Sequence, residues 1–494
     1  MKRYDNIKAF ESSYEYLGVH REDTEYIFRV WAPNADIVYV VGDFNDWDEC
    51  DPMMLIGDGI WERRISSKKV QENGLYKYKI KNGLQELYKA DPYAFCTKGD
   101  GETASVICDI SGYVWRDKSW LEYRCNKGDK GPINIYKIHA SSWRLHENGN
   151  SYSWSELATE LAPYVKQMGY THVELMTITE HQSDNAFEYG IDSYYAPIAR
   201  MGKPYDLMSF VDSMHEAGIG VILDWIPSYF LKKEHSLANF DGQPLYEYED
   251  QNSNATRYFD LSRKEVKSFL ISNAEFWFEM YHADGLRLDP ASIKICTESC
   301  EGIAFYQELN LSIRKHFSDV LIIDAYEENI LDKFNLCYDQ KTDIIKLSLG
   351  YQTTFPCNKC LLMGTEIGQL SESDKIQSVD WSLLNYDSNV KLQYYAAELN
   401  HLYLKASPLW NDSGFEWIYN NDNGIMSYKR IDVNGNELIM ILNFTSATKE
   451  NFTIGVSKKG VYEEIFNSDD ARFGGNGRLN GKCIETANIK CQKY

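Results

Sequence analysis

The middle of the chain alternates continuous apolar runs with segments of helical apolar spacing. Between the apolar runs, residues 155–169 and 209–220 repeat apolar positions at helical spacing and contain glycine where each pattern stops. The apolar runs are INIYKIHA (133–140), HVELMTI (172–178), GVILDWI (220–226) and GLRLD (285–289). Apolar strands that alternate with helices are typical of a parallel sheet buried on both faces. The pattern therefore predicts an α/β domain, and polar residues at the strand ends mark where a βα-barrel has its active site.

The strand predicted at 285–289 ends in two polar residues of opposite charge. Arg287 and Asp289 are two positions apart, so their side chains point to the same side of the strand. A neighbouring guanidinium lowers the pKa of a carboxyl group, so we expect Asp289 to stay ionised. Such a carboxylate is a candidate nucleophile for a glycosidic carbon. A structural Arg–Asp ion pair explains the same two residues equally well. Asp224 lies near the end of the preceding apolar run.

The segments on either side of this region have strand patterns. Residues 14–112 alternate apolar and polar positions with frequent turn signals, which predicts a small β-sandwich. Near the other end, residues 423–431, 437–445 and 462–469 are predicted strands of a C-terminal antiparallel sandwich. We therefore expect three domains, at 1–112, 113–405 and 406–494.

Several long motifs in a fixed order make the chain resemble the 1,4-α-glucan branching enzymes of glycoside hydrolase family 13. These motifs are VWAPNADIVYVVGDFNDW (30–47), IYKIHASSW (135–143), SYYAPIARMGKP (193–204), AGIGVILDWIPSYF (217–230), GLRLD (285–289), LLMGTEIGQ (361–369) and SVDW (378–381). The resemblance implies a (β/α)8-type TIM barrel that follows a starch-binding-type module. It also implies retaining transfer of a cut α-1,4 glucan chain onto a 6-hydroxyl.

The resemblance assigns roles to four residues of the barrel region. Asp289 matches the nucleophile, and Arg287 matches its positioning partner. Asp224 matches the aspartate of the third strand. Tyr189 matches an aromatic platform under the reacting sugar, although Phe187-Glu188 precedes it where the family has Trp-Gly.

In the N-terminal module, the resemblance implies two sugar contacts. Trp47 follows the GDFN turn and Lys77 lies in the YKY strand, where related modules touch sugar. The family's second tryptophan is Leu84 here. A module that merely packs on the barrel is the equal alternative.

Other positions depart from the family. Tyr229 stands where the third-strand motif has a histidine that contacts the sugar. In VLIIDAYEEN (320–329), alignment places Ala325 at the position of the acid/base glutamate, and a shift of one residue places Asp324 there. Glu327 and Glu328 follow and would have to reach back from a loop. Loss of a general acid costs about 10²–10⁴ in rate.

The third catalytic carboxylate of the family follows a histidine, and the sequence has no His-Asp pair between residues 289 and 381. The interval 326–361 has room for one strand near 334–338 and one helix near 344–352, where the family fits two such units. We therefore expect a barrel that lacks one strand–helix unit.

Three hypotheses follow for the function. The first is a glucan-binding paralogue with an impaired active site, which binds through Trp47, Lys77, Trp61 and Tyr189. The second is an active α-1,4 to α-1,6 transglycosylase, or an α-glucan hydrolase, with Asp289 as nucleophile and Asp324, Glu327 or Glu328 as substitute acid. The third is a decaying paralogue or an interaction protein, in either case without a role in glucan metabolism.

Composition narrows the partners. The net charge of −22 disfavours nucleic acid and anionic membranes but does not affect a neutral glucan such as glycogen, amylose or amylopectin. With no apolar leader and no run of membrane-spanning length, we expect a soluble, cytoplasmic protein.

The 11 cysteines show no disulfide framework, so free thiols are expected. A zinc tetrad of Cys296, Cys300, Cys357 and Cys360 is the alternative to free thiols. No motif implies an organic cofactor, and none makes a metal the main expectation.

Overall fold

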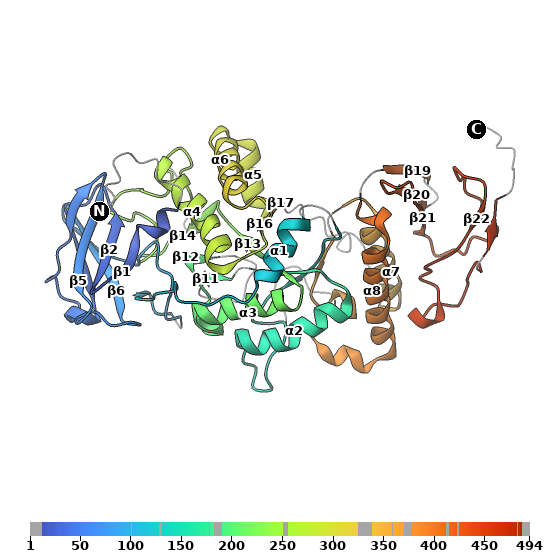
Figure 1. Cartoon of the computed structure of the whole chain (residues 1–494), viewed down its shortest axis with the longest axis horizontal. Helices are drawn as coiled ribbons and strands as arrows, with labels where there is room; N and C mark the ends of the chain where they lie inside the picture. Colours follow the sequence, from blue (N-terminus) through green and yellow to red (C-terminus); the bar gives the residue numbers. More distant parts are fainter. Residues whose placement is uncertain are drawn as a thin grey trace.

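Three β-rich layers follow one another along the long axis of the molecule (Figure 1). The N-terminal strands lie at one end, the parallel sheet with its helices in the middle, and the C-terminal strands at the other end. The structure is a computed structural model. It describes residues 12–99, 101–127, 131–176, 178–181, 190–249, 255–324, 338–357, 359–369, 378–411, 414–421, 424–481 and 483–486.

The central sheet is parallel throughout, as the alternating pattern predicted. Its strand order is β17-β16-β13-β10-β9-β18. The bounds are β9 (Asn134–Ile138), β10 (His172–Leu175), β13 (Gly220–Trp225), β16 (Gly285–Leu288), β17 (Leu321–Asp324) and β18 (Lys359–Leu362). All four residues of β10 and of β16 are buried, which explains their continuous apolar character.

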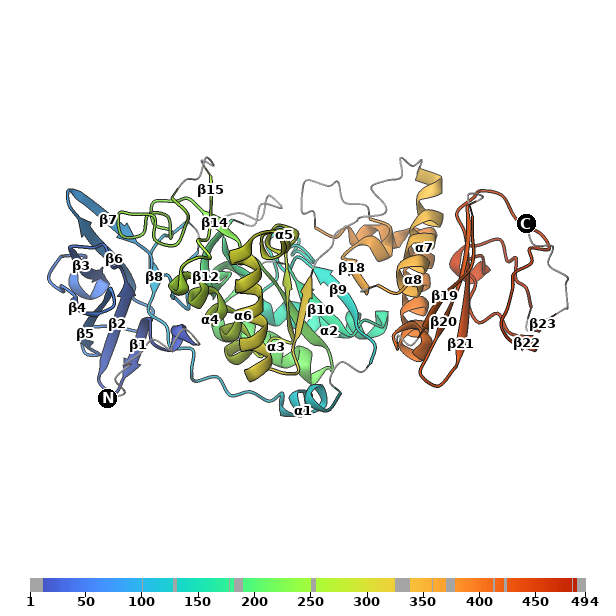
Figure 2. The ribbon, with the colours of Figure 1, turned by 90° about the horizontal axis from the view of Figure 1, so that it is seen from above.

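Helices α2 (Trp154–Met168), α3 (Pro204–Glu216), α4 (Lys264–Tyr281) and α6 (Cys300–His316) lie against this sheet (Figure 2). Local sequence sets the bounds of α2. The Ser153 hydroxyl accepts from the Glu156 N–H, while the Glu156 carboxylate accepts from the Ser153 N–H. Gly169 ends α2 at a φ of 76°, a conformation that glycine adopts without strain.

Among the described residues, the sheet has fewer strands than the eight of a complete barrel. The described residues contain six parallel strands, with β17 and β18 at the two ends of the strand order. Helix α7 (Tyr338–Thr354) contains the helix predicted near 344–352. It begins at Tyr338, so that residue does not belong to the strand predicted near 334–338, and residues 334–337 lie outside the described part. The described strands form a partial TIM barrel, in agreement with the predicted shortening.

The N-terminal strands form the predicted β-sandwich. One sheet has the order β1-β2-β5-β4, and the other has β3-β6-β7 with β8 paired to β6. The bounds are β1 (Gly18–Glu22), β2 (Glu25–Trp31), β3 (Ile37–Gly42), β4 (Met54–Gly57), β5 (Ile60–Ser66), β6 (Leu75–Asn82), β7 (Gln85–Lys89) and β8 (Ser105–Val106). The side chains of Phe28, Val38 and Tyr78 are fully buried between the sheets.

The C-terminal strands differ in part from the prediction. β20 (Ile425–Ile431) and β21 (Glu437–Asn443) confirm two expected strands, and β19 (Gly414–Asn421) pairs with β20 although it was not predicted. The strand expected at 462–469 is wrong beyond Tyr462. Only β22 (Val461–Tyr462) forms there, and it pairs with β23 (Ile484–Glu485). At the end of this segment Asn467 starts a turn instead: its side chain accepts the Asp469 N–H, and its backbone oxygen accepts the Asp470 N–H.

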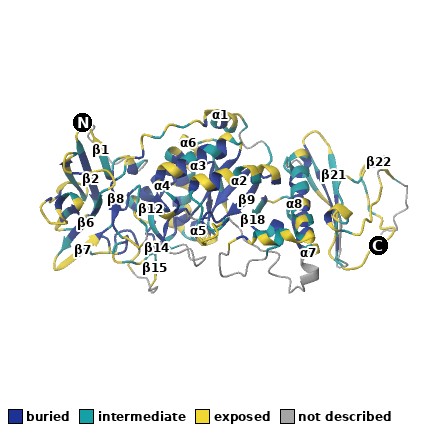
Figure 3. Cartoon of the chain, turned by 90° about the horizontal axis from the view of Figure 1, so that it is seen from below, coloured by how far each residue is buried: buried dark blue, intermediate teal, exposed yellow. Residues whose placement is uncertain are grey.

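The remaining elements connect these layers. Helix α8 (Asp387–Lys405) packs with α7 between the central sheet and the C-terminal strands (Figure 2). Shorter elements are α1 (Lys118–Lys127), α5 (Pro290–Glu298), β11 (Thr179–His181), β12 (Ile191–Pro197), β14 (Tyr229–Leu231) and β15 (Thr256–Tyr258). Buried residues concentrate in the central sheet, whereas the last C-terminal strands are more exposed (Figure 3). Within the described residues, no helix combines the length and apolarity needed to cross a bilayer.

Candidate active site

Asp289 lies directly after β16 and caps the N-terminus of α5. Its carboxylate accepts from the Ala291 N–H at 3.0 Å, from the Ser292 N–H at 3.3 Å and from the Ser292 hydroxyl. Pro290 occupies the first position of the helix, where a missing N–H costs nothing. The predicted nucleophile therefore also has a structural role, because it accepts hydrogen bonds from three donors in the first turn of α5.

Arg287 is not among the groups that shift the pKa of Asp289 most, contrary to the expected pairing. Burial raises the pKa of Asp289, and the opposing hydrogen bonds come mainly from Ser292 and Ala291. Arg287 Nη1 instead donates to both carboxylate oxygens of Glu174, at 2.9 Å each, and to Cys360 Sγ at 3.2 Å. The guanidinium reaches Glu174 on β10 because both side chains lie inside the curved sheet.

Asp224 belongs to the same interior cluster. Its Oδ2 lies 3.2 Å from Lys137 Nζ, which is also 3.1 Å from Glu174 Oε1. Burial raises the pKa of Asp224 to about 8, and a hydrogen bond with Glu174 adds to this increase. The attractive charges of Lys137 and Arg287 lower the pKa of Glu174. We call Lys137, Glu174, Asp224, Arg287 and Cys360 the lumen cluster; it combines two cations, one carboxylate and one carboxyl group that is mostly protonated at neutral pH.

Sequence reasoning identified Arg287 and Asp224 but missed the other three members of the lumen cluster. Glu174 is fully buried and Lys137 is 8 % exposed, although both lie in apolar runs. A charged residue in a strand buried on both faces needs a partner, because an unpaired buried charge is costly. That signal was available for Lys137 and Glu174. Nothing in the sequence pointed to Cys360.

Asp324 lies on the opposite side of the sheet from Arg287. Directly paired residues share a face, and β17 pairs Ile323 with Arg287 and Asp324 with Leu288. The Asp324 carboxylate accepts a hydrogen bond from the Tyr306 hydroxyl of α6 at 2.9 Å. The side chain of Asp324 is thus turned toward the helix layer. Ala325, Glu327 and Glu328 lie outside the described residues.

Two tyrosines lie near Asp289. The Tyr194 hydroxyl donates to the backbone oxygen of Tyr229 at 2.7 Å. The pKa of Tyr194 is raised mainly by burial, and to a smaller extent by Tyr229 and Asp289. The Ser292 and Ser228 hydroxyls are joined by a hydrogen bond of 2.8 Å, which links α5 to the turn before Tyr229. The structure thus brings Tyr229 and Asp289 into one neighbourhood. Tyr189 lies outside the described residues.

The module residues have different exposures. Trp47 is 37 % exposed, and its Nε1 donates to Asp43 Oδ1 at 3.1 Å. Lys77 is half-buried, and its Nζ donates to the Thr103 hydroxyl at 2.5 Å. Trp61 is 8 % exposed and donates to the Ala32 backbone oxygen, so it packs in the core of the module. Its expected role in sugar stacking is therefore wrong. Leu84 is fully exposed.

The four cysteines of the zinc alternative do not assemble into a site. Cys360 contacts Arg287 in the lumen cluster, whereas Cys296 is a buried residue of α5. In the parts of the chain that the structure describes, no group of three or more His, Cys, Asp or Glu side chains could hold a metal ion.

Two family models match the ends of the chain. The model of carbohydrate-binding module 48, the isoamylase N-terminal domain, matches residues 16–94. The model of the α-amylase C-terminal all-β domain matches residues 417–493. Both matches fall on the antiparallel layers of the structure.

Solved structures share the fold at low sequence identity. A pullulanase from Anoxybacillus sp. LM18-11, complexed with maltotriose, superposes with a TM-score of 0.72 at 17% identity and covers 98% of this chain and 86% of that chain. Pullulanase type I from Bacillus subtilis str. 168, complexed with maltose, has a TM-score of 0.70 at 16% identity and covers 86% of this chain and 78% of that chain.

Curated relatives have a much higher sequence identity to this chain than the solved structures do. The 1,4-alpha-glucan branching enzyme GlgB of Bacillus cereus (strain AH820) is 34% identical over 581 residues, covering 97% of this chain and 90% of the relative. That of Halothermothrix orenii is 36% identical over 588 residues, covering 96% and 92%. Both alignments are longer than the 494-residue chain, so the relatives contain segments that this chain lacks. On this similarity over nearly its whole length, the chain belongs to the 1,4-α-glucan branching enzyme family.

Proposed function

We propose that this protein is an α-glucan-binding member of the branching-enzyme family whose catalytic centre is impaired, and that it acts as a cytoplasmic scaffold or regulator in glycogen or starch metabolism. The orientation of β17 is the observation that carries the proposal. The described part of β17 aligns Ile323 with Arg287 inside the sheet and directs Asp324 toward α6. This strand therefore directs an apolar side chain, not a carboxylate, to the interior.

Retaining glycoside chemistry needs two carboxyl groups about 5–5.5 Å apart on opposite sides of the scissile bond. Asp289 supplies one such group, but its oxygens accept hydrogen bonds from Ala291 and Ser292. These hydrogen bonds oppose the rise in pKa that burial causes, and they hold the carboxylate against the start of α5. On this proposal, the lack of an inward-facing carboxylate on the described part of β17 and the capped nucleophile together impair the centre.

Glucan binding is supported independently of catalysis. The relatives are named as α-glucan enzymes, and the N-terminal model is that of a carbohydrate-binding module. Trp47 offers a partly exposed indole, and aromatic rings stack on the apolar faces of sugars. Asp43 accepts hydrogen bonds from both the Trp47 indole and the Leu75 N–H. Lys77 lies two residues after Leu75 on the same strand. We assign glucan binding to this end of the module.

A branching assay tests the catalytic half of the proposal. Purified protein is incubated with amylose, and new α-1,6 linkages are measured by debranching and chain-length profiling. Asp289→Asn is the control, because asparagine keeps the helix cap while removing the nucleophilic carboxylate. We expect wild type and variant to be equal. Branching that Asp289→Asn abolishes would overturn the proposal and would favour a substitute acid such as Glu327 or Glu328.

Affinity electrophoresis in gels that contain glycogen or amylopectin tests the binding half. We expect the glucan to retard the wild type, and Trp47→Ala to weaken retardation by about 2–10-fold, the contribution of one aromatic contact. Tyr386→Ala, which removes an aromatic side chain that is 62 % exposed on the start of α8, is the matched control. A wild type that no α-glucan retards would favour an interaction protein without a role in glucan metabolism.

A further inference from the structure

Two cysteines of the segment that joins the module to the barrel lie side by side. The Val106 N–H donates to the backbone oxygen of Cys96 at 3.0 Å, and Thr97 forms an antiparallel bridge with Ser105. In that register, Cys96 is opposite Val106, and Cys108 is its diagonal neighbour on the same face. Each thiol is the largest influence on the pKa of the other, and the Cys96 thiol donates to the Thr97 backbone oxygen at 3.5 Å.

The surroundings give the two thiols unequal acidity. The contact with Cys108 lowers the pKa of Cys96, whereas the same contact and burial raise the pKa of Cys108. Both side chains are partly exposed. A thiolate is the form that reacts with peroxides, so the direction of the two pKa shifts favours Cys96 over Cys108 as the attacking sulfur.

Both thiols lie against the barrel. Burial is the main cause that raises the pKa of Tyr281, the last residue of α4, and Cys108 and Cys96 raise it further. The Tyr281 hydroxyl is buried, and it has no hydrogen-bond partner among the described residues. The cysteine pair is therefore located where the linking segment meets a core helix.

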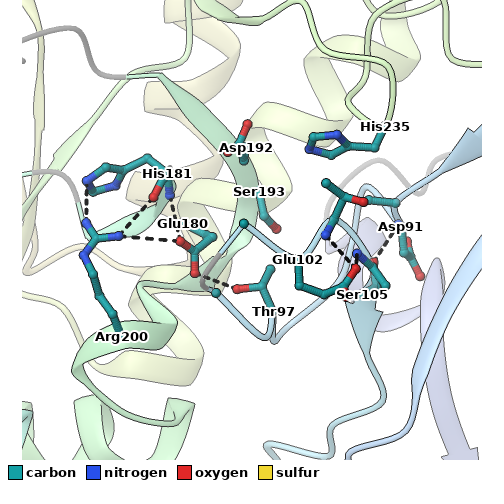
Figure 4. Close-up of a pocket in the computed structure, with 15 residues that line it drawn as sticks. Asp91, Thr97, Glu102, Ser105, Glu180, His181, Asp192, Ser193, Arg200 and His235 are labelled. Carbon is teal, nitrogen blue, oxygen red and sulfur yellow. Dashed lines mark hydrogen bonds and ion pairs between the residues drawn. The ribbon is translucent and has the colours of Figure 1, made fainter. Parts of the chain in front are cut away.

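The segment between the two cysteines forms one wall of a polar cavity of about 190 Å³ (Figure 4). The Thr97 hydroxyl donates to Glu180 Oε2 at 2.7 Å, and this contact joins the segment to β11. Across the cavity lie Asp192 and Ser193 of β12. Further lining residues are Ala90, Asp91, Gly99, Gly101, Glu102, Thr103, Ala104, Ser105, His181, Arg200 and His235.

We propose that Cys96 and Cys108 are a peroxide-reactive dithiol that closes to a disulfide and thereby restrains the cavity wall between them. Cys96 thiolate attacks hydrogen peroxide, the O–O bond breaks, and sulfenic acid and hydroxide form. The Cys108 sulfur then attacks the sulfenic sulfur, and the sulfenic oxygen leaves as water after taking up a proton. In total, two thiols lose two electrons and two protons while one peroxide becomes two waters. The proposal does not depend on the glucan function.

Peptide mapping of the full chain tests the covalent step. Reduced protein is treated with hydrogen peroxide, blocked with N-ethylmaleimide and digested without reductant. We expect a peptide pair linked through Cys96 and Cys108, lighter by two hydrogens than the separate peptides. Cys50→Ser, which removes an exposed thiol of the same module, should leave that link unchanged. Oxidation of Cys50 and Cys125 without the Cys96–Cys108 link would overturn the proposal.

The order of reaction is tested in Cys108→Ser with dimedone, which traps sulfenic acid. We expect the adduct on Cys96, and an adduct-free Cys96 would overturn its assignment as the attacking sulfur. The effect on the cavity wall is tested by limited proteolysis between residues 97 and 107. We expect cleavage there to slow several-fold in the oxidised protein. An unchanged cleavage rate in fully linked protein would overturn the restraint.

Discussion

The Tyr306 hydroxyl donates a hydrogen bond of 2.9 Å to Asp324, which joins the last residue of β17 to helix α6. This contact fixes the direction of a carboxylate that the sequence had offered as a substitute catalytic acid. A carboxylate on the helix side of a sheet cannot protonate a sugar oxygen on the other side.

Asp324→Asn should therefore leave any turnover of α-glucan unchanged within about twofold, whereas loss of a true general acid costs about 10²–10⁴. The measurement is release of reducing ends and new branches from amylose. Tyr306→Phe should lower the free energy of unfolding by about 0.5–1.5 kcal/mol, the contribution of one hydrogen bond. A large loss of turnover in Asp324→Asn would place its carboxylate in the reaction after all.

Asp289 has a structural role that its substitution will reveal. Asp289→Ala should lower the free energy of unfolding by about 0.5–2 kcal/mol, because the N-terminal N–H groups of α5 lose their cap. Asp289→Asn should change it much less, since asparagine caps helices nearly as well as aspartate. Urea denaturation of the two variants measures the difference. Equal losses in both variants would argue against the capping role.

Glu174 compensates two buried cations in the lumen cluster. Glu174→Ala should lower the free energy of unfolding by about 3–5 kcal/mol, because Arg287 and Lys137 would keep buried charges without this partner. Glu160→Ala is the matched control, since the Glu160–Arg144 pair is exposed. Its loss should cost no more than about 1 kcal/mol. Similar losses in the two variants would contradict the assigned role of Glu174.

Asp224 makes stability depend on pH. Its pKa is about 8 in the folded protein, against an ordinary value of 3.8. Between these values the folded state retains a proton that the unfolded state releases, so the free energy of unfolding falls as pH rises from about 4 to about 8. Asp224→Asn removes this dependence. We expect the Tm difference, variant minus wild type, to become more positive as the pH rises from about 5 to about 8.5. A difference that becomes more negative would contradict the raised pKa of Asp224.

Much of the fold was predictable because its signals are local. The apolar run 220–226 became β13, and the helical spacing at 155–169 became α2, which stops at Gly169. The strand expected at 462–469 failed beyond Tyr462, and near its end the Asn467 side chain accepts the Asp469 N–H in a local turn. Strand β19 was missed although it pairs with β20 over most of its length.

The sequence by itself determined the family, the order of the three layers and the strands that carry Asp224 and Arg287, because periodicity and ordered motifs are properties of the chain alone. Only the tertiary structure decided which groups those side chains meet. Arg287 binds Glu174, 113 positions away, and Asp324 turns toward Tyr306. Both outcomes depend on the register between strands that are distant in sequence, and a shift of one residue would exchange the two faces of a strand.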